Sequence, residues 1–256
     1  MSVMKTLTMY YHRLGSPRFF YGYATRWLPW IAGIAVLLLV AGWGLGLLVA
    51  PEDYQQGNSY RIIFIHVPAS IAALSGFMAM GVCGLFILVW RMKMAEILLK
   101  AIAPFGTLLA ALSLITGALW GKPTWGTYWV WDARLTSMLV LLFLYIAVQA
   151  LHNAVRDPRQ AARAAGLLSL VGVINVVIVK YSVDWWFSLH QGSTLKIIGE
   201  TTMPWSMLTP LLLSLFGMYF LYAAIVLVRA KTEIVWRERR SNWVRQMLSG
   251  RNHHGV

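Results

Sequence analysis

Six long apolar runs dominate this sequence and restrict what the chain can fold into. Crossing the hydrocarbon core of a bilayer takes about 20 apolar residues in a helix, which satisfies its own backbone hydrogen bonds. Only 12% of the residues are charged, whereas soluble proteins carry about 25%. The sequence therefore predicts an all-α integral membrane protein with six transmembrane helices. The apolar runs cover, approximately, residues 27–49, 60–89, 99–119, 135–151, 164–181 and 204–228.

Together these runs predict a single membrane domain that covers residues 1–256. The first run is too long for the core of a signal peptide, and no small-residue cleavage site follows it, so we interpret it as a retained span. We expect a cytoplasmic N-terminal segment over 1–26, a six-helix bundle over 27–228 and a basic cytoplasmic tail over 229–256.

The basic residues predict the orientation of the bundle. Six spans place both termini on one side, and 17 of the 22 Lys and Arg residues fall on that side. The positive-inside rule therefore predicts cytoplasmic termini and a periplasmic segment between the third and fourth helices. Four acids lie inside and five outside, so the net charge of +13 belongs entirely to the inner side. That charge favours anionic membrane lipid as a partner, and nucleic acid is not needed to explain it.

The segment between the third and fourth runs is rich in tryptophan. Because glycine and proline interrupt helices, Gly121, Pro123 and Gly126 predict a loop there. Indole rings are broad, rigid and apolar, so a shelf of them suits a large flat apolar ligand. The alternative is an aromatic belt at the membrane interface. Four of the 13 tryptophans lie within twelve residues of this segment: Trp120, Trp125, Trp129 and Trp131.

Two of the six histidines fall on the same outer side as these tryptophans. His66 follows Arg61 by five residues, which places it roughly 7 Å below the membrane surface, a depth at which an ionisable group is a functional candidate. His190 lies in the loop before the sixth run. Each histidine alone is more often a hydrogen-bonded structural residue. Together, beside the indole rings, they form a candidate axial pair for haem iron, which imidazole suits.

The outer side also offers partners for the two propionates of haem. Arginine is the preferred partner of a carboxylate, and Arg61 and Arg134 lie at helix ends beside the candidate site. The alternative role of both arginines is to anchor their helices at the interface. We expect Asp132 to cap the fourth helix, to pair with Arg134 or to orient an indole N–H.

The tryptophan segment resembles the WWD signature of the haem-handling proteins of cytochrome c biogenesis. Within that superfamily the chain resembles the CcmC family over nearly its whole length, and two outer histidines with six spans fit that family. The resemblance rests on Trp120–Ser137, Tyr54–Ile63, His66–Pro68 and Leu189–Thr194.

The resemblance carries expectations about function. It implies a protein of the bacterial inner membrane in which His66 and His190 ligate the iron of haem b. It also implies that the tryptophan segment presents this haem to the periplasmic chaperone CcmE. The expected partners are the ABC transporter subunits CcmA and CcmB and the small membrane protein CcmD. Such a chain is a transport component rather than an enzyme.

Two other functions stay open at the level of sequence. A bis-histidine b-type membrane redox protein usually places its histidines deeper in the bundle. A small-molecule transporter without haem places polar groups near the middle of the membrane, where Asn175 is the main polar side chain. The chain has one cysteine, Cys83, and no Cys-x-x-Cys-His motif, which excludes a c-type cytochrome and a thiol oxidoreductase.

Overall fold

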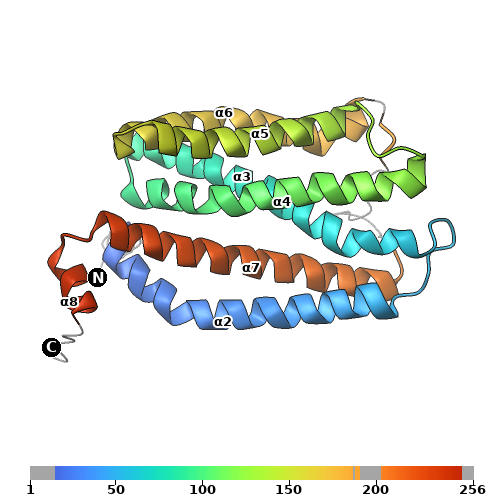
Figure 1. The fold of residues 1–256 in the computed structure, drawn as a ribbon, viewed down its shortest axis with the longest axis horizontal. Helices are drawn as coiled ribbons and strands as arrows, with labels where there is room; N and C mark the ends of the chain where they lie inside the picture. Colours follow the sequence, from blue (N-terminus) through green and yellow to red (C-terminus); the bar gives the residue numbers. More distant parts are fainter. Residues whose placement is uncertain (1–14, 187, 191–202, 250–256) are drawn as a thin grey trace, which may run out of the picture.

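The computed structural model describes residues 15–186, 188–190 and 203–249, and this part of the chain is predominantly helical (Figure 1). Six of its helices are long and apolar enough to cross a membrane, which confirms the predicted number of spans. The ends of the predicted N-terminal segment and tail, before residue 15 and after residue 249, lie outside the described residues. The elements are α2 (Pro17–Trp43), the π-helix η1 (Gly44–Val49), the 3-10 helix η2 (Asn58–Ile62), α3 (Ile63–Trp90), α4 (Lys93–Trp125), α5 (Ala133–Ala154), α6 (Pro158–Trp185), α7 (Trp205–Arg237) and α8 (Asn242–Leu248).

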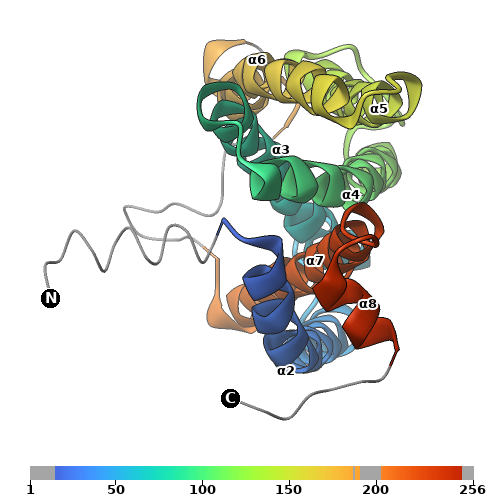
Figure 2. The same ribbon diagram turned by 90° about the vertical axis from the view of Figure 1, so that its left-hand side faces the viewer.

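The spanning helices stack as three layers of two. α5 and α6 form one outer layer, α3 and α4 the middle layer, and α2 and α7 the other outer layer (Figure 2). α3 contacts α4, α6 and α7, while α4 contacts α5 and α7. The middle layer is therefore the most deeply buried, and it carries the residues on which the rest of the bundle packs.

Successive spans run in opposite directions, so their connections gather at two ends of the bundle (Figure 1). α2 begins and α7 ends at one end, which we call the terminal end. The connections from α2 to α3 and from α4 to α5 lie at the other end, where α6 ends and α7 begins, and we call this the tryptophan end. The outer ends of the first and last spans therefore lie on the same side of the bundle.

Two helices extend well beyond the apolar runs that predicted them. α2 begins at Pro17 rather than near residue 27, because proline suits the first helical position and no other proline precedes residue 27. α7 continues to Arg237 rather than ending near residue 228, and Pro204 is its N-cap rather than its first residue. Hydropathy marks the part of a helix inside the hydrocarbon, whereas helical hydrogen bonding continues into the polar interface.

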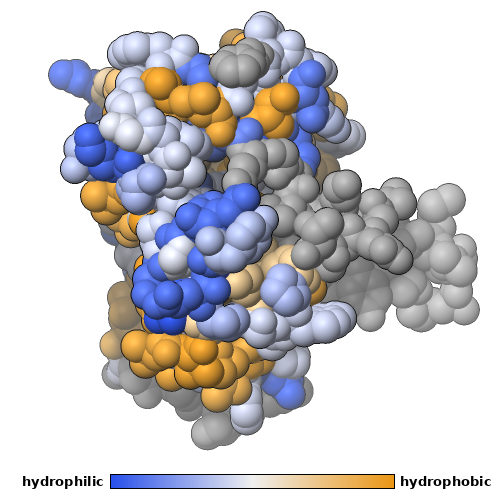
Figure 3. All heavy atoms as spheres, turned by 90° about the vertical axis from the view of Figure 1, so that its right-hand side faces the viewer, coloured by the Kyte–Doolittle hydropathy of each residue, from blue (hydrophilic) through white to orange (hydrophobic). Residues whose placement is uncertain are grey.

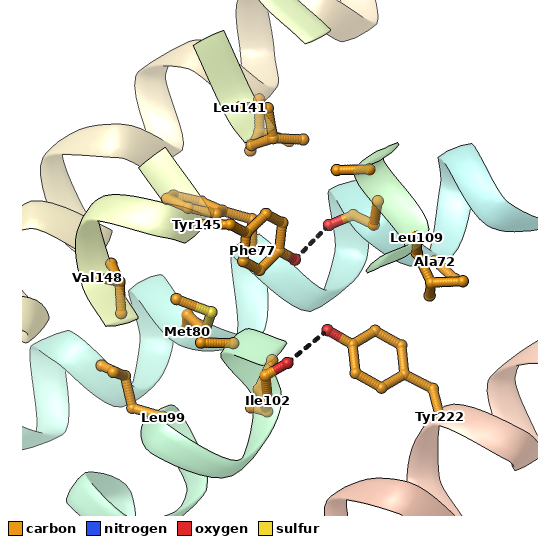
Figure 4. Close-up of a cluster of buried hydrophobic side chains, with 14 of the residues drawn as sticks. Ala72, Phe77, Met80, Leu99, Ile102, Leu109, Leu141, Tyr145, Val148 and Tyr222 are labelled. Carbon is orange, nitrogen blue, oxygen red and sulfur yellow. Dashed lines mark hydrogen bonds between the residues drawn. The ribbon is translucent and has the colours of Figure 1, made fainter. Parts of the chain in front are cut away.

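Hydrogen bonds from two buried tyrosines join helices of different layers (Figure 4). The hydroxyl of Tyr145 on α5 donates to the Ala73 carbonyl on α3 at 2.7 Å. The hydroxyl of Tyr222 on α7 donates to the Ile102 carbonyl on α4 at 3.2 Å. A polar group left unpaired in the membrane costs several kcal/mol. Each hydroxyl therefore fixes both the position of its own helix and that of the helix to which it donates.

Glycine allows the closest approach between α3 and α6. A Cβ atom added at Gly84 would lie 2.3 Å from the carbonyl oxygen of Gly166 and 3.0 Å from its carbonyl carbon. A Cβ atom added at Gly166 would lie 3.2 Å from the Cα atom of Gly84. Small residues commonly let the backbones of membrane helices meet in this way. The contact between these layers is therefore made by backbone atoms at this crossing.

Charged side chains join α4 to α7 near the terminal end. Arg237 donates to Glu96 through Nη1 and to Glu233 through Nε, both at 2.8 Å. Lys100 donates to the two carboxylate oxygens of Glu233 at 3.0 and 2.9 Å. Charges at the edge of a membrane are costly unless they are paired. This network therefore allows α4 to begin at Lys93, six residues before the apolar run that predicted it.

Candidate functional site

The predicted site residues belong to the tryptophan end of the bundle. Where this end is not covered by grey atoms in Figure 3, hydrophilic and hydrophobic residues lie side by side on it. The histidines occupy separate elements: His66 lies near the start of α3, and His190 lies in the segment that follows α6.

Two tryptophans in the last turns of α4 each contact one of the two histidines. The ring of Trp120 lies 5.8 Å from the ring of His66, and the ring of Trp125 lies 4.7 Å from the ring of His190, measured between centroids. Both ring pairs meet edge to face. One helix end therefore contacts both histidines, which are 124 positions apart in the sequence.

The predicted loop is shorter than the sequence indicated. The expectation that Gly121 and Pro123 break the helix is wrong, because α4 continues through both to Trp125. A Cβ atom at Gly121 would lie 2.9 Å from the Trp125 ring, so glycine leaves space for the indole to fold back on its own helix. Only Gly126, at φ 80°, ends the helix as predicted. Trp120 and Trp125 are thus helical residues.

The ring of His66 packs against α4 at Gly117 and Thr116. A Cβ atom at Gly117 would lie 3.0 Å from Cε1 of His66, so a larger residue would displace the ring. Nδ1 of His66 lies 2.9 Å from the hydroxyl oxygen of Thr116. That hydroxyl donates its hydrogen to the Leu112 carbonyl at 2.6 Å and is left to accept. This arrangement favours the tautomer of His66 with its proton on Nδ1, which leaves the lone pair on Nε2.

A serine pair lies beside the other nitrogen of His66. The Ser70 hydroxyl is 3.5 Å from Nε2 of His66, at the limit of a hydrogen bond. It lies closer to the His66 carbonyl, at 2.7 Å, and to the Ser113 hydroxyl, at 2.5 Å. Nε2 is therefore only weakly engaged and is available to a ligand.

His190 is held by a carboxylate. Its Nδ1 lies 3.2 Å from Oδ2 of Asp132 and 3.3 Å from the Ser188 hydroxyl. Ser188 also donates a short hydrogen bond to the same carboxylate oxygen. Asp132 accepts from the backbone N–H of Leu135 at 2.8 Å through its other oxygen, so the predicted cap of the fourth spanning helix is confirmed. A proton on Nδ1 donated to Asp132 leaves Nε2 of His190 with its lone pair.

The electrostatics of this pair favour a neutral imidazole beside an ionised carboxylate. Burial lowers the pKa of His190 below its ordinary value, although Asp132 acts in the opposite direction. Burial alone would raise the pKa of Asp132, but the hydrogen bonds from Ser188 and from the Leu135 N–H outweigh it and lower that pKa. Near neutral pH, His190 is therefore an uncharged base, the form in which imidazole ligates a metal.

The two arginines occupy different environments. Arg61 donates through Nη1 to the Leu47 carbonyl at 2.5 Å and through Nη2 to the Ala50 carbonyl at 2.7 Å. These carbonyls end the π-helix η1, so Arg61 caps the first span. The side chain of Arg134 makes no hydrogen bond or ion pair to the described residues, and its Nε is buried without a partner, as is Nε of Arg61. Arg134 is thus free to bind an anion.

The remaining two tryptophans form a separate pair in the segment Gly126–Asp132. Trp129 and Trp131 meet edge to face with ring centroids 5.4 Å apart. Trp131 is 78% exposed. Trp129 is partly buried, and its Nε1 has no hydrogen-bond partner among the described residues. An exposed indole and an unpaired N–H donor are both suited to a ligand or partner that covers this segment.

Several residues of this site could not be found by motif. Thr116 lies 50 positions after His66 in the sequence, and nothing in its surroundings marks it as a partner of that histidine. Gln56 accepts from the Trp120 indole N–H at 2.7 Å across a similarly long stretch of chain. Only Ser70 could be predicted from the local sequence as a neighbour of His66, because it lies one helical turn later and therefore on the same face of the helix.

The site combines two imidazoles, indole edges and one guanidinium without a hydrogen-bond partner among the described residues. Both imidazoles are arranged to offer Nε2, and they flank the same helix end. Such a set can hold a metal at the centre of a flat apolar group that carries carboxylates. The polar residue predicted for a mid-membrane transport path does not contribute, because Asn175 donates to the Ser137 carbonyl at 2.9 Å and joins α6 to α5.

Comparisons with known proteins identify the family. The family model described as CcmC, Heme exporter protein C, matches residues 10–245. Heme exporter protein C of Escherichia coli (strain K12) is 47% identical over 93% of this chain and 96% of its own length. The protein of the same name from Haemophilus influenzae is 40% identical over 92% of this chain and 96% of its own length. That from Bradyrhizobium diazoefficiens is 44% identical over 89% and 86% of the two chains. The chain therefore belongs to the CcmC family.

Proposed function

We propose that this multi-pass protein of the bacterial inner membrane binds haem b at its tryptophan end through His66 and His190. The family assigns the chain to haem export for cytochrome c maturation. The observation that carries the proposal is that one helix end, with Trp120 and Trp125, contacts both histidines. In this proposal haem is the cargo of a transport component, and the chain forms no covalent bond with it.

The residues of the site divide the tasks of holding haem. The two Nε2 atoms ligate the iron from opposite faces, and the tryptophan rings contact the porphyrin. Arg134 binds a propionate through its free guanidinium. Arg61, which the sequence placed in the same role, has two of its nitrogens engaged by backbone carbonyls. We therefore propose Arg134 as the main propionate partner and Arg61 as a residue that shapes the entrance.

The exposed part of the site fits a handover. Trp131 lies at the surface of the tryptophan end, where another protein can reach the haem edge without entering the bundle. We propose that the periplasmic chaperone CcmE receives haem there. The resemblance to the family adds CcmA, CcmB and CcmD as partners in the membrane. The basic excess predicted for the cytoplasmic side suits that side to anionic lipid.

The proposal requires the tryptophan end to face the periplasm. It is supported by the distribution of basic residues, because 17 of the 22 fall in the sequence segments predicted to face the cytoplasm. A reporter enzyme fused after Val256 is expected to be active only in its cytoplasmic form, and a reporter inserted after Tyr54 only in its periplasmic form. The opposite pattern would place the site in the cytoplasm and contradict the proposal.

An absorbance spectrum tests haem binding directly. Protein purified in detergent from haem-replete cells is expected to show a Soret band and the sharp visible bands of a six-coordinate low-spin haem after reduction. A preparation without a Soret band would contradict the proposal and favour a transporter of another substrate. Rapid, reversible reduction by a quinol would instead support the bis-histidine b-type redox protein.

Replacing Arg134 with alanine is expected to weaken haem retention. The lost charge-assisted contact is worth about 1–3 kcal/mol, or roughly 10- to 100-fold in the dissociation constant. Arg134→Lys should recover part of it, because lysine keeps the charge without the planar fork. Transfer of haem to excess apomyoglobin measures the effect, with Arg163→Ala at the terminal end as the matched control. Equal transfer rates for Arg134→Ala and the parent would assign Arg134 to the anchoring of its helix.

A further inference from the structure

We propose that Asp132 and Thr116 are positioning residues that make His190 the stronger iron ligand and His66 the weaker one, so that handover begins at His66. This inference rests on the proposed haem site and concerns the order in which its two bonds are released. It starts from the acceptor that each histidine finds for its Nδ1 proton.

His190 donates to a charged acceptor. The Asp132 carboxylate lies 3.2 Å from Nδ1 and is itself fixed by the Leu135 N–H and the Ser188 hydroxyl. A carboxylate behind a ligating histidine fixes the ring and its tautomer and raises the basicity of the other nitrogen. The Ser188 hydroxyl also accepts the backbone N–H of His190 at 3.2 Å, which holds the residue as well as its ring. His190 is thus a strong, oriented donor.

His66 donates to a neutral acceptor. The Thr116 hydroxyl at 2.9 Å fixes the same tautomer, but it carries no charge, and its own hydrogen is bound to the Leu112 carbonyl. The basicity of Nε2 therefore gains less than it does in His190. This weaker donation favours loss of the bond from His66.

The placement of the two histidines agrees with this order. His66 belongs to the buried middle layer and is packed between Gly117 and Trp120. His190 lies outside the spanning helices, in contact with Trp125 and with the segment that carries the exposed Trp131. Release of His66 first leaves haem attached to the element that lies beside the handover surface.

Carbon monoxide bound to the reduced protein reports which ligand remains. It replaces the weaker axial ligand, and its C–O stretching frequency falls as the ligand on the opposite face becomes a stronger donor. We expect Asp132→Asn to raise this frequency and to raise the reduction potential of the haem, because the remaining histidine donates less. We expect Thr116→Val to leave the frequency unchanged and to speed carbon monoxide binding by about tenfold, because only the departing ligand is weakened.

Matched variants separate these effects from a loss of structure. Asp157→Asn changes the corresponding helix cap of α6, where Asp157 accepts from the Arg159 N–H at 2.9 Å and has no histidine partner. Thr124→Val removes a hydroxyl that donates to the Trp120 carbonyl on the same helix as Thr116. Both controls should keep the parent's frequency, potential and binding rate. Asp132→Ser keeps a capping side chain too short to reach His190, and it should behave as Asp132→Asn does.

The outcomes distinguish failure of the proposed haem binding from failure of the proposed difference between the two ligands. A parent protein that binds no haem contradicts the proposed function. A parent that binds haem, with Asp132→Asn altering neither frequency nor potential, contradicts only the unequal pair. A frequency shift in Thr116→Val without one in Asp132→Asn would show that His66 is the ligand that remains, and the order would then be reversed.

Discussion

Replacing His190 with glycine is expected to strip most of the haem from the purified protein or to leave it five-coordinate, and His66→Gly is expected to do the same to a smaller extent. Each variant removes one of the two proposed iron ligands and leaves a cavity the size of an imidazole. Because the second histidine and the tryptophans remain, a fraction of the haem should stay bound through a single ligand. The loss of the low-spin visible bands, measured on equal amounts of protein, reports the change.

Added imidazole provides the control for this result. Free imidazole should fill the cavity in either glycine variant and restore the six-coordinate spectrum, which a misfolded protein could not do. His152→Gly removes a histidine at the terminal end, where Nδ1 lies 3.0 Å from the Val148 carbonyl, and it should leave the spectrum unchanged. If both site variants kept the parent's six-coordinate spectrum, other residues would have to ligate the iron.

A methyl group added at Gly84 is expected to destabilise the whole bundle. The Cβ atom of Gly84→Ala would meet a backbone carbonyl at 2.3 Å, which cannot rotate away as a side chain can. Relief requires α3 and α6 to move apart over the length of their crossing. Overpacking of this kind costs about 1–3 kcal/mol or more. We expect a lower apparent melting temperature in detergent and a smaller yield of folded protein.

Two other glycines make the test quantitative. Gly166→Ala should cost less than Gly84→Ala, because its Cβ atom would lie at 3.2 Å from the nearest atom. Gly33→Ala on α2 has no atom within 4 Å of the added Cβ, and it should be neutral or slightly stabilising because alanine favours a helix. Equal melting temperatures for all three variants would show that the two helices do not meet at this crossing in the membrane.

The sequence predicted the number of spans because hydropathy over about 20 residues reflects the solvent in which a helix lies. It predicted helix ends less well, for a reason that Pro123 illustrates. Proline lacks one hydrogen-bond donor, but near the end of a helix the carbonyl it leaves unpaired is exposed to water or to a side chain. α4 therefore passes through Pro123 and ends at Gly126, where a positive φ stops it.

The candidate site, too, could be predicted from the sequence only in part. The residues with distinctive chemistry, such as His66, His190 and Asp132, were identified from their type and side of the membrane, and their role as haem ligands and partners stays a prediction. The alternatives for Arg61 and Arg134 could not be separated, because both are arginines at helix ends. Only the fold shows that Arg61 binds the Leu47 and Ala50 carbonyls while Arg134 keeps a free guanidinium.

The double hydrogen bond from Arg61 has a mechanical consequence. Its guanidinium donates to the Leu47 and Ala50 carbonyls at the end of the first span, and His66 follows Arg61 by five residues in the sequence. α2 packs along α7, and α7 carries the ionic network at the opposite end of the bundle. Arg61 therefore joins the end of the α2–α7 layer directly to the start of α3, the helix that carries His66, a proposed iron ligand.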